Sequence, residues 1–73
     1  MTQQEIGYSI KERRKKLGIN QQTLADLSGV AVNTVVAIER GVGNPRLVTM
    51  LTILDTLGLQ IDINIKQLDY ETV

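Results

Sequence analysis

Two short apolar segments separated by a glycine constrain this chain more than any other feature of its sequence. Leu24 and Leu27 recur at helical spacing before Gly29, and Val35 and Ile38 do so after it. Gly29 suits the turn between them, because a left-handed backbone conformation is inexpensive only without a Cβ atom. The sequence therefore predicts two short helices that pack at a fixed angle, the second from about residue 32 to residue 40.

Capping and termination signals predict a further helix on each side of this pair. Thr2 and Glu5 have the spacing of a capping box at the start of the first helix, and Gly18 is a suitable end for it. Asn44-Pro45 is a suitable start for the last helix, since proline at the first helical position loses no hydrogen bond. Gly58 ends that helix, so four helices are expected in all.

After Gly58 the period of the apolar residues changes from helical spacing to two. Over residues 59–66 apolar and polar side chains alternate, which predicts a β-strand with one apolar face, formed by Leu59, Ile61, Ile63 and Ile65. No second strand is predicted elsewhere, so we expect this one to pair with its copy across the two-fold axis of a homodimer. The predicted architecture is mainly α, with one domain over residues 1–66 and a flexible tail over residues 67–73.

The composition argues against several classes of site. The chain has neither cysteine nor histidine, and its only serines are Ser9 and Ser28. Acid–base or nucleophilic catalysis therefore lacks its usual residues, and we expect no enzyme, no catalytic residue, no cofactor and no metal site. The N-terminal residues do not resemble a signal peptide, and no apolar run approaches the roughly 20 residues of a membrane span. We expect a cytoplasmic protein without a membrane partner.

The formal net charge of zero conceals an uneven distribution of charge. Residues 1–46 carry seven basic and four acidic side chains, a net charge of +3, whereas residues 47–73 carry one basic and four acidic side chains, a net charge of −3. A local basic face attracts a phosphate backbone whatever the total charge is. The run from Lys11 to Lys16 is equally compatible with a solvated helix face, so the charge pattern permits a nucleic-acid partner without requiring one.

The ordered set of motif residues resembles the Xre family, the lambda-repressor-like helix-turn-helix group of phage and bacterial repressors. The matching residues are Arg14–Gln21, Leu24-Ala25, Gly29-Val30, Val35, Ile38–Gly41 and Pro45. The resemblance covers roughly residues 6–59. It implies a four-helix lambda-repressor-like DNA-binding domain whose recognition helix, from about Val32, enters the major groove of double-stranded DNA.

The resemblance also implies roles for individual residues. Gln21 matches the position that anchors the duplex backbone, and the positions that face base edges are Val32, Asn33, Val36 and Ala37. Arg40 resembles a residue that reaches a base or a phosphate. Further candidates for phosphate contacts are Gln22, Thr34 and Arg46. On physical grounds, Asn33 is suited to pair with adenine through two hydrogen bonds, and a valine is suited to touch a thymine methyl group.

Arg14 and Glu39 match a pair that forms a mostly buried ion pair in this family, between the first and third helices. Arg14 is therefore predicted to be structural, and Arg13, Lys15 and Lys16 to be the more solvent-facing charges of the basic run. One residue departs from the family pattern: Ala31 stands where a serine or threonine usually caps the recognition helix. Alanine is a poor N-cap, so the exact start of that helix stays open.

The pattern Leu-Gly-Leu-x-Ile-x-Ile at residues 57–63, which follows the helix-turn-helix motif, is similar to the C-terminal strand region of small antitoxins of the HipB type. Those proteins dimerise through this strand, repress their own operon and hold a HipA-like kinase toxin. The combined prediction is a homodimeric transcriptional repressor that binds a palindromic operator and serves as the antitoxin of a HipBA-type operon, with a HipA-like kinase as partner. The alternative is a protein-interaction module that keeps the fold without specific DNA binding, given the zero net charge and the apolar recognition helix.

Overall fold

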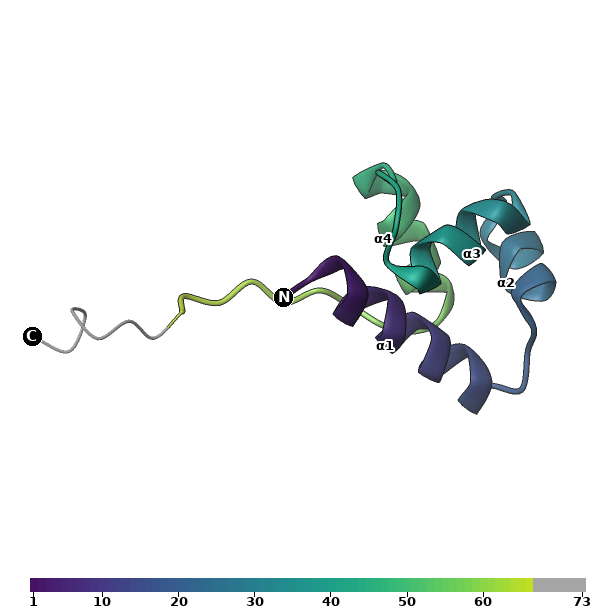
Figure 1. Cartoon of the computed structure of the whole chain (residues 1–73). Helices are drawn as coiled ribbons and strands as arrows, with labels where there is room; N and C mark the ends of the chain where they lie inside the picture. The colour runs from purple at the N-terminus through teal and green to yellow at the C-terminus, as the bar shows by residue number, and fades with distance from the viewer. Residues whose placement is uncertain (67–73) are drawn as a thin grey trace, which may run out of the picture.

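The computed structural model describes residues 1–66, and its helices gather at one end of the molecule (Figure 1). The described residues form four helices: α1 (Gln3–Lys16), α2 (Gln21–Ser28), α3 (Val32–Arg40) and α4 (Leu47–Thr56). The segment after α4 passes the N-terminus and extends away from the helices (Figure 1). The prediction of a mainly α fold with four helices is confirmed.

Local signals explain where α1 and α2 begin and where α2 ends. The Thr2 hydroxyl accepts a hydrogen bond from the Glu5 amide at 3.1 Å, and the Asn20 side chain accepts one from the Thr23 amide at 2.8 Å. Each bond satisfies an amide that has no partner within its helix. Gly29 ends α2 with a φ angle of 69°, in the left-handed region that favours glycine.

The hydrophobic core lies where all four helices meet. Each helix contributes a fully buried side chain to it: Ile10 from α1, Leu24 from α2, Val35 from α3 and Ile53 from α4. Helix α3 packs against both α1 and α2, and α2 also packs against α4. The buried face of α3 is therefore held on two sides, which fixes the direction of its opposite face.

Helix α4 begins two residues after the predicted start. Arg46 is its N-cap, with an extended backbone at φ −67° and ψ 143°, and its carbonyl oxygen accepts the first helical hydrogen bond from the Met50 amide at 3.0 Å. Pro45 lies in the preceding loop, where it lines a hollow together with residues of α3. The chain thus follows α3 through Pro45 before α4 begins.

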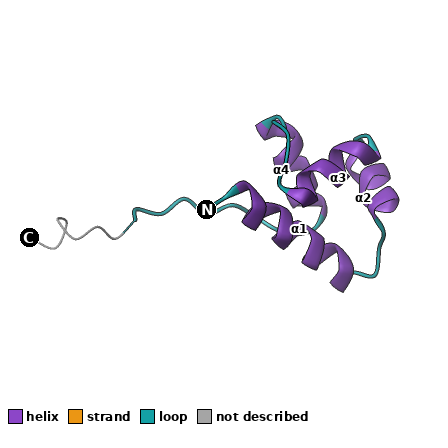
Figure 2. Ribbon diagram, viewed as in Figure 1, coloured by secondary structure: helices purple, strands orange, loops and turns teal. Residues whose placement is uncertain are grey.

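The strand predicted over residues 59–66 is not found in the single chain: residues 1–66 contain no strand (Figure 2). A strand is defined by backbone hydrogen bonds to a neighbour, and no backbone hydrogen bond joins residues 60–66 to another described residue. Leu59 and Ile61 pack against the core, whereas Ile63 and Ile65 are 95% and 90% exposed. Pairing with a second copy stays a prediction, and the predicted tail lies outside the described residues.

The first turn of α3 provides a test of helix capping. Ala31 is the N-cap of α3 and makes no side-chain hydrogen bond. The Ala31→Ser substitution should raise the free energy of unfolding by about 1 kcal/mol, because a hydroxyl can accept a hydrogen bond from a free amide of that turn. Urea denaturation measures the difference. Ala31→Val is the control because it adds volume without an acceptor, and equal stability of the two variants would contradict the prediction.

Candidate nucleic-acid interface

The outward face of α3 carries four of the predicted DNA-contacting residues. They share one face because their spacing follows the helical period: Asn33, Val36, Ala37 and Arg40. Asn33 and Arg40 are exposed, and the other two are half-buried. The opposite face is buried through Val35 and Ile38. Helix α3 therefore presents an amide and a guanidinium to solvent on either side of two small apolar side chains.

Two further predicted residues of α3 lie beside this outward face. Val32 is half-buried and packs against the hydrophobic core, so part of its surface is already used in the fold. Thr34 is half-buried and lines a surface hollow. The two residues therefore have less free surface than Asn33, which stands exposed between them.

The loop between α3 and α4 extends the same surface. Residues 42–45 and four α3 residues, Asn33, Thr34, Ala37 and Ile38, line a hollow of about 280 Å³. The loop is tied to α1, since the Gln3 side-chain amide donates to the Gly43 carbonyl at 2.9 Å. Residues 42–45 were not among the predicted site residues. Nothing in the local sequence indicates that they lie against α3, because that contact depends on how the helices pack.

A buried ion pair joins α1 to α3 beneath the outward face. Arg14 Nε donates to Glu39 Oε2 at 2.6 Å, and an Arg14 NH group donates to Glu39 Oε1 at 3.0 Å. The Arg14 side chain is 10% exposed and the Glu39 side chain 2%. The hydrogen bond to Glu39 raises the pKa of Arg14 above its ordinary value. The two residues predicted from the resemblance to pair are thus in direct contact.

The remaining hydrogen bonds of this pair extend it to α2. Arg14 also donates to the Ile19 carbonyl at 3.0 Å, and the Gln21 side-chain amide donates to Glu39 Oε1 at 3.0 Å. Every buried side-chain nitrogen and oxygen atom of the described residues has a hydrogen-bond partner. We call Arg14, Glu39 and Gln21 the Arg14 network. It joins three helices, so it fixes where α3 lies relative to α1 and to the start of α2.

Gln21 therefore has a structural contact as well as its predicted role as an anchor for the duplex backbone. One N–H of its amide is used by Glu39, which leaves the second N–H and the carbonyl oxygen available. The neighbouring Gln22 is exposed and donates to Asp26 at 2.9 Å within α2. Both side chains remain at the N-terminal end of α2, where free amides favour an anion.

The basic side chains differ in solvent exposure and in their hydrogen bonds to the rest of the chain. Arg40, Arg46, Lys15 and Lys16 are exposed. Arg13 was predicted to be one of the more solvent-facing charges, but it is half-buried and its Nε donates to the Leu57 carbonyl at 2.9 Å. Carbonyl groups at a helix end have no partner within the helix, which explains this contact. The two residues are 44 positions apart, so no sequence spacing indicates it.

Gly7 is a positioning residue that we did not identify from the sequence. It is buried in α1, and an added Cβ would overlap the backbone carbonyl oxygen of Ile38 in α3. The close approach of the two helices therefore depends on the missing side chain. A signal for it does exist, because a glycine inside an otherwise amphipathic helix often has a packing reason.

Two other classes of site concern residues 1–66 as a whole. That part of the chain contains no group of three or more His, Cys, Asp or Glu side chains suited to hold a metal ion. None of its helices is long and apolar enough to cross a membrane.

A family model described as Helix-turn-helix matches residues 10–64, which is most of the chain and includes all of α2 and α3. The chain belongs to the helix-turn-helix family. The Xre-type resemblance of the motif residues is thereby confirmed. In this family member the two motif helices are α2 and α3, joined at Gly29.

Curated relatives of this helix-turn-helix protein are named as uncharacterised transcriptional regulators of the helix-turn-helix type. One from Methanothermobacter thermautotrophicus is 41% identical over 49 residues, which is 67% of this chain and 71% of the relative. One from Haemophilus influenzae is 44% identical over 50 residues, 68% of this chain and 51% of the relative. The regulator y4mF from Sinorhizobium fredii is 34% identical over 62 residues, 85% of this chain and 82% of the relative.

A solved structure also matches the arrangement of the four helices. It is the restriction-modification controller protein C.AhdI from Aeromonas hydrophila, with a TM-score of 0.72 and 34% sequence identity. The match covers 80% of this chain and 84% of the controller protein. The helix-turn-helix fold of this chain is thus supported by sequence and by structure.

Proposed function

We propose that this helix-turn-helix protein is a sequence-specific DNA-binding transcriptional repressor that acts as a homodimer on a palindromic operator. The outward face of α3 carries the proposal. Asn33 and Arg40 are exposed there, and the Arg14 network holds the helix from below. A rigid helix with exposed polar ends fits a major groove about 12 Å wide. The names of the relatives and of the controller protein support a role in regulation.

The proposal of a homodimer rests on the segment after α4. A two-fold dimer presents two recognition helices to two half-sites about one helical turn apart, which is why such proteins bind palindromes. The proposed contacts between copies come from the apolar residues of that segment, of which Ile63 and Ile65 are almost fully exposed. Two almost fully exposed isoleucines on one side of an extended segment form an apolar edge that a partner could cover.

The finer proposal is that the repressor is the antitoxin of a HipBA-type operon with a HipA-like kinase as its toxin. It rests on the similarity of residues 57–63 to the C-terminal strand region of HipB-type antitoxins. Co-expression with the product of the adjacent gene tests it. A stable complex with a HipA-like kinase would support the proposal, and a neighbouring gene of unrelated function would contradict it.

Binding to DNA distinguishes the proposal from a protein-interaction module. A duplex selected from a random library is compared with a scrambled duplex of the same composition by fluorescence anisotropy at several salt concentrations. The affinity should fall steeply with salt, because phosphate contacts release counterions from the duplex. Weak binding to both duplexes with no dependence on salt would instead favour the protein-interaction module.

Asn33 provides the residue-level prediction. The Asn33→Ala substitution should weaken binding to the selected duplex by about 1–3 kcal/mol and leave binding to the scrambled duplex nearly unchanged, because a bidentate contact to a base discriminates by that amount. The matched comparison is Arg46→Ala, which should weaken binding to both duplexes alike and reduce the salt slope by about one. Equal loss on both duplexes for Asn33→Ala would contradict its role as a reader of bases.

A further inference from the structure

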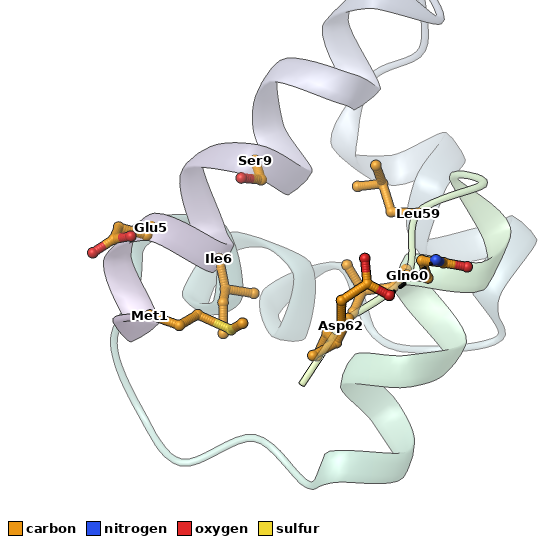
Figure 3. A pocket seen from close by; sticks show the side chains of 9 residues that line it. Met1, Glu5, Ile6, Ser9, Leu59, Gln60 and Asp62 are labelled. Atoms are coloured by element: carbon orange, nitrogen blue, oxygen red, sulfur yellow. Dashed lines mark hydrogen bonds between the residues drawn. The ribbon is translucent and has the colours of Figure 1, made fainter. Parts of the chain in front are cut away.

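A mostly apolar hollow lies between the start of α1 and the segment that follows α4. Its volume is about 260 Å³, and its apolar lining comes from Met1, Ile6, Leu54, Leu59 and Ile61. Figure 3 shows Met1 and Ile6 on the α1 side of the hollow, with Leu59 and Asp62 across from them. The hollow is large enough for an aliphatic side chain, and it adjoins the segment that we propose to pair between two copies.

The segment beyond this hollow has backbone groups without hydrogen-bond partners among the described residues, and it has exposed apolar side chains. Residues 60–66 make no backbone hydrogen bond to another described residue, and Ile63 and Ile65 are 95% and 90% exposed. Leu59 and Ile61, by contrast, pack against the core of their own chain. The apolar face of the segment is therefore divided, with its first half used within the chain and its second half free.

We infer that Ile65 of each copy docks into this hollow on the other copy, with the two segments paired antiparallel about a two-fold axis through Ile63; the inference rests on the homodimer of the proposed function. With this axis, Ile63 of one chain lies opposite Ile63 of the other, and Ile65 lies opposite Ile61 of the other chain. Since Ile61 lines the hollow, a side chain opposite it lies at the entrance. Both hollows are filled in the same way.

The apolar face narrows the choice of axis. Residues on one face of a pair of strands must keep the same parity, so the axis can pass through residue 62, 63 or 64 without moving an isoleucine to the polar face. The axis through Asp62 pairs Ile61 with Ile63 and Ile65 with Leu59, and the axis through Ile63 gives Ile61, Ile63 and Ile65 each an isoleucine opposite. An axis through Asn64 would leave Ile61 without an apolar partner.

Charges on the polar face decide between the axes through Asp62 and Ile63. An axis through Asp62 would place two aspartates directly opposite each other, and like charges in that position repel. With the axis through Ile63, Asp62 faces Asn64 and Gln60 faces Lys66, so no like charges meet. The two faces together therefore select one register.

The contact of Arg13 with Leu57 prepares the segment for this docking. Leu57 caps the end of α4, and its carbonyl oxygen accepts a hydrogen bond from Arg13 of α1 at 2.9 Å. The Leu59 amide donates to the Leu54 carbonyl at 2.8 Å. These two bonds hold the start of the segment beside α1, so the hollow exists before a second copy arrives.

Lysine substitutions at two adjacent positions test which face of the segment meets the other copy. Ile65→Lys should weaken dimerisation at least about 100-fold, measured by sedimentation equilibrium, because a lysine would replace the docked isoleucine in both hollows. Asn64→Lys should leave dimerisation unchanged or tighten it a few-fold, since position 64 faces Asp62 of the other copy. Both residues are exposed, so neither variant should alter the unfolding midpoint of a monomer.

The register is tested with single cysteines, which the chain permits because it has none of its own. Paired Cα atoms about 4.5–5.5 Å apart allow a disulfide, so the residue on the axis should cross-link to its own copy. Ile63→Cys should give disulfide-linked dimers on mild oxidation, faster than either Asp62→Cys or Asn64→Cys.

The outcomes separate this inference from the proposed function. A dimer that Ile65→Lys leaves intact, or fastest cross-linking through position 62 or 64, would overturn the docking and its register while the homodimer stands. A wild-type chain that is monomeric at all concentrations would overturn both the docking and the homodimer. Specific DNA binding by such a monomer would preserve the rest of the proposed function.

Discussion

The Glu39→Ala substitution should lower the free energy of unfolding by about 3–5 kcal/mol, because it leaves a buried guanidinium without its carboxylate. Arg14 loses two hydrogen bonds at 2.6 and 3.0 Å, and the Gln21 amide loses its partner at 3.0 Å. Small domains have only about 0.05–0.15 kcal/mol of stability per residue. The expected loss is therefore a large part of the total free energy of unfolding of this chain. Urea denaturation followed by circular dichroism measures the loss.

Two further variants show whether the loss comes from the uncompensated charge. Glu12→Ala removes a glutamate whose side chain accepts one hydrogen bond among the described residues, from Tyr8 at 3.4 Å, and it should change stability by no more than about 0.5 kcal/mol. The double variant Arg14→Met with Glu39→Met removes both charges, and it should recover most of the stability lost in Glu39→Ala. A double variant less stable than Glu39→Ala would contradict this account.

The Gly41→Ala substitution should also destabilise the chain strongly, through backbone strain and overlap together. Gly41 ends α3 with a φ angle of 70°, where a residue with a Cβ loses about 1–2 kcal/mol. An added Cβ would also lie 2.7 Å from the Gln4 Cα atom in α1. Overpacking of this kind adds about 1–3 kcal/mol, because the obstacle is backbone and cannot rotate away.

Comparison with Gly29→Ala separates the effect of the steric overlap at Gly41 from the effect of backbone strain. Gly29 has a φ angle of 69°, but nothing lies within 4 Å of the Cβ that alanine would add there. Its variant should show the strain alone, and Gly41→Ala should therefore be the less stable of the two in urea. Equal stability of the two variants would mean that α1 moves away from the end of α3 without loss.

Most of the fold could be predicted because its signals are local. The caps at Thr2 and Asn20, the glycine that ends α2 and the spacing of apolar residues each act within a few positions of the chain. The start of α4 was predicted at Asn44-Pro45 and is found at Leu47, because the backbone is still extended at Arg46. A proline that permits a helix start does not require one there.

The candidate site was less predictable than the helices that carry it. The outward positions of α3 follow from helical spacing, so Asn33 and Arg40 could be named from the sequence. Val32 was named as well, yet part of its surface packs against the core. Arg13 was expected in solvent and instead holds the Leu57 carbonyl. Both outcomes depend on neighbours that are distant in the sequence.

Two apolar segments joined at Gly29 thus determined that the chain is a helix-turn-helix protein, because helix periods, caps and turns depend on residues close together in the chain. The tertiary structure alone decided how α3 is held. Gly7 must let the α3 backbone approach α1, and Gln21 must reach Glu39 across 18 positions. The packing of the helices also divided the predicted strand into two half-buried apolar residues, Leu59 and Ile61, and two exposed ones, Ile63 and Ile65, because burial depends on what the packed helices leave uncovered.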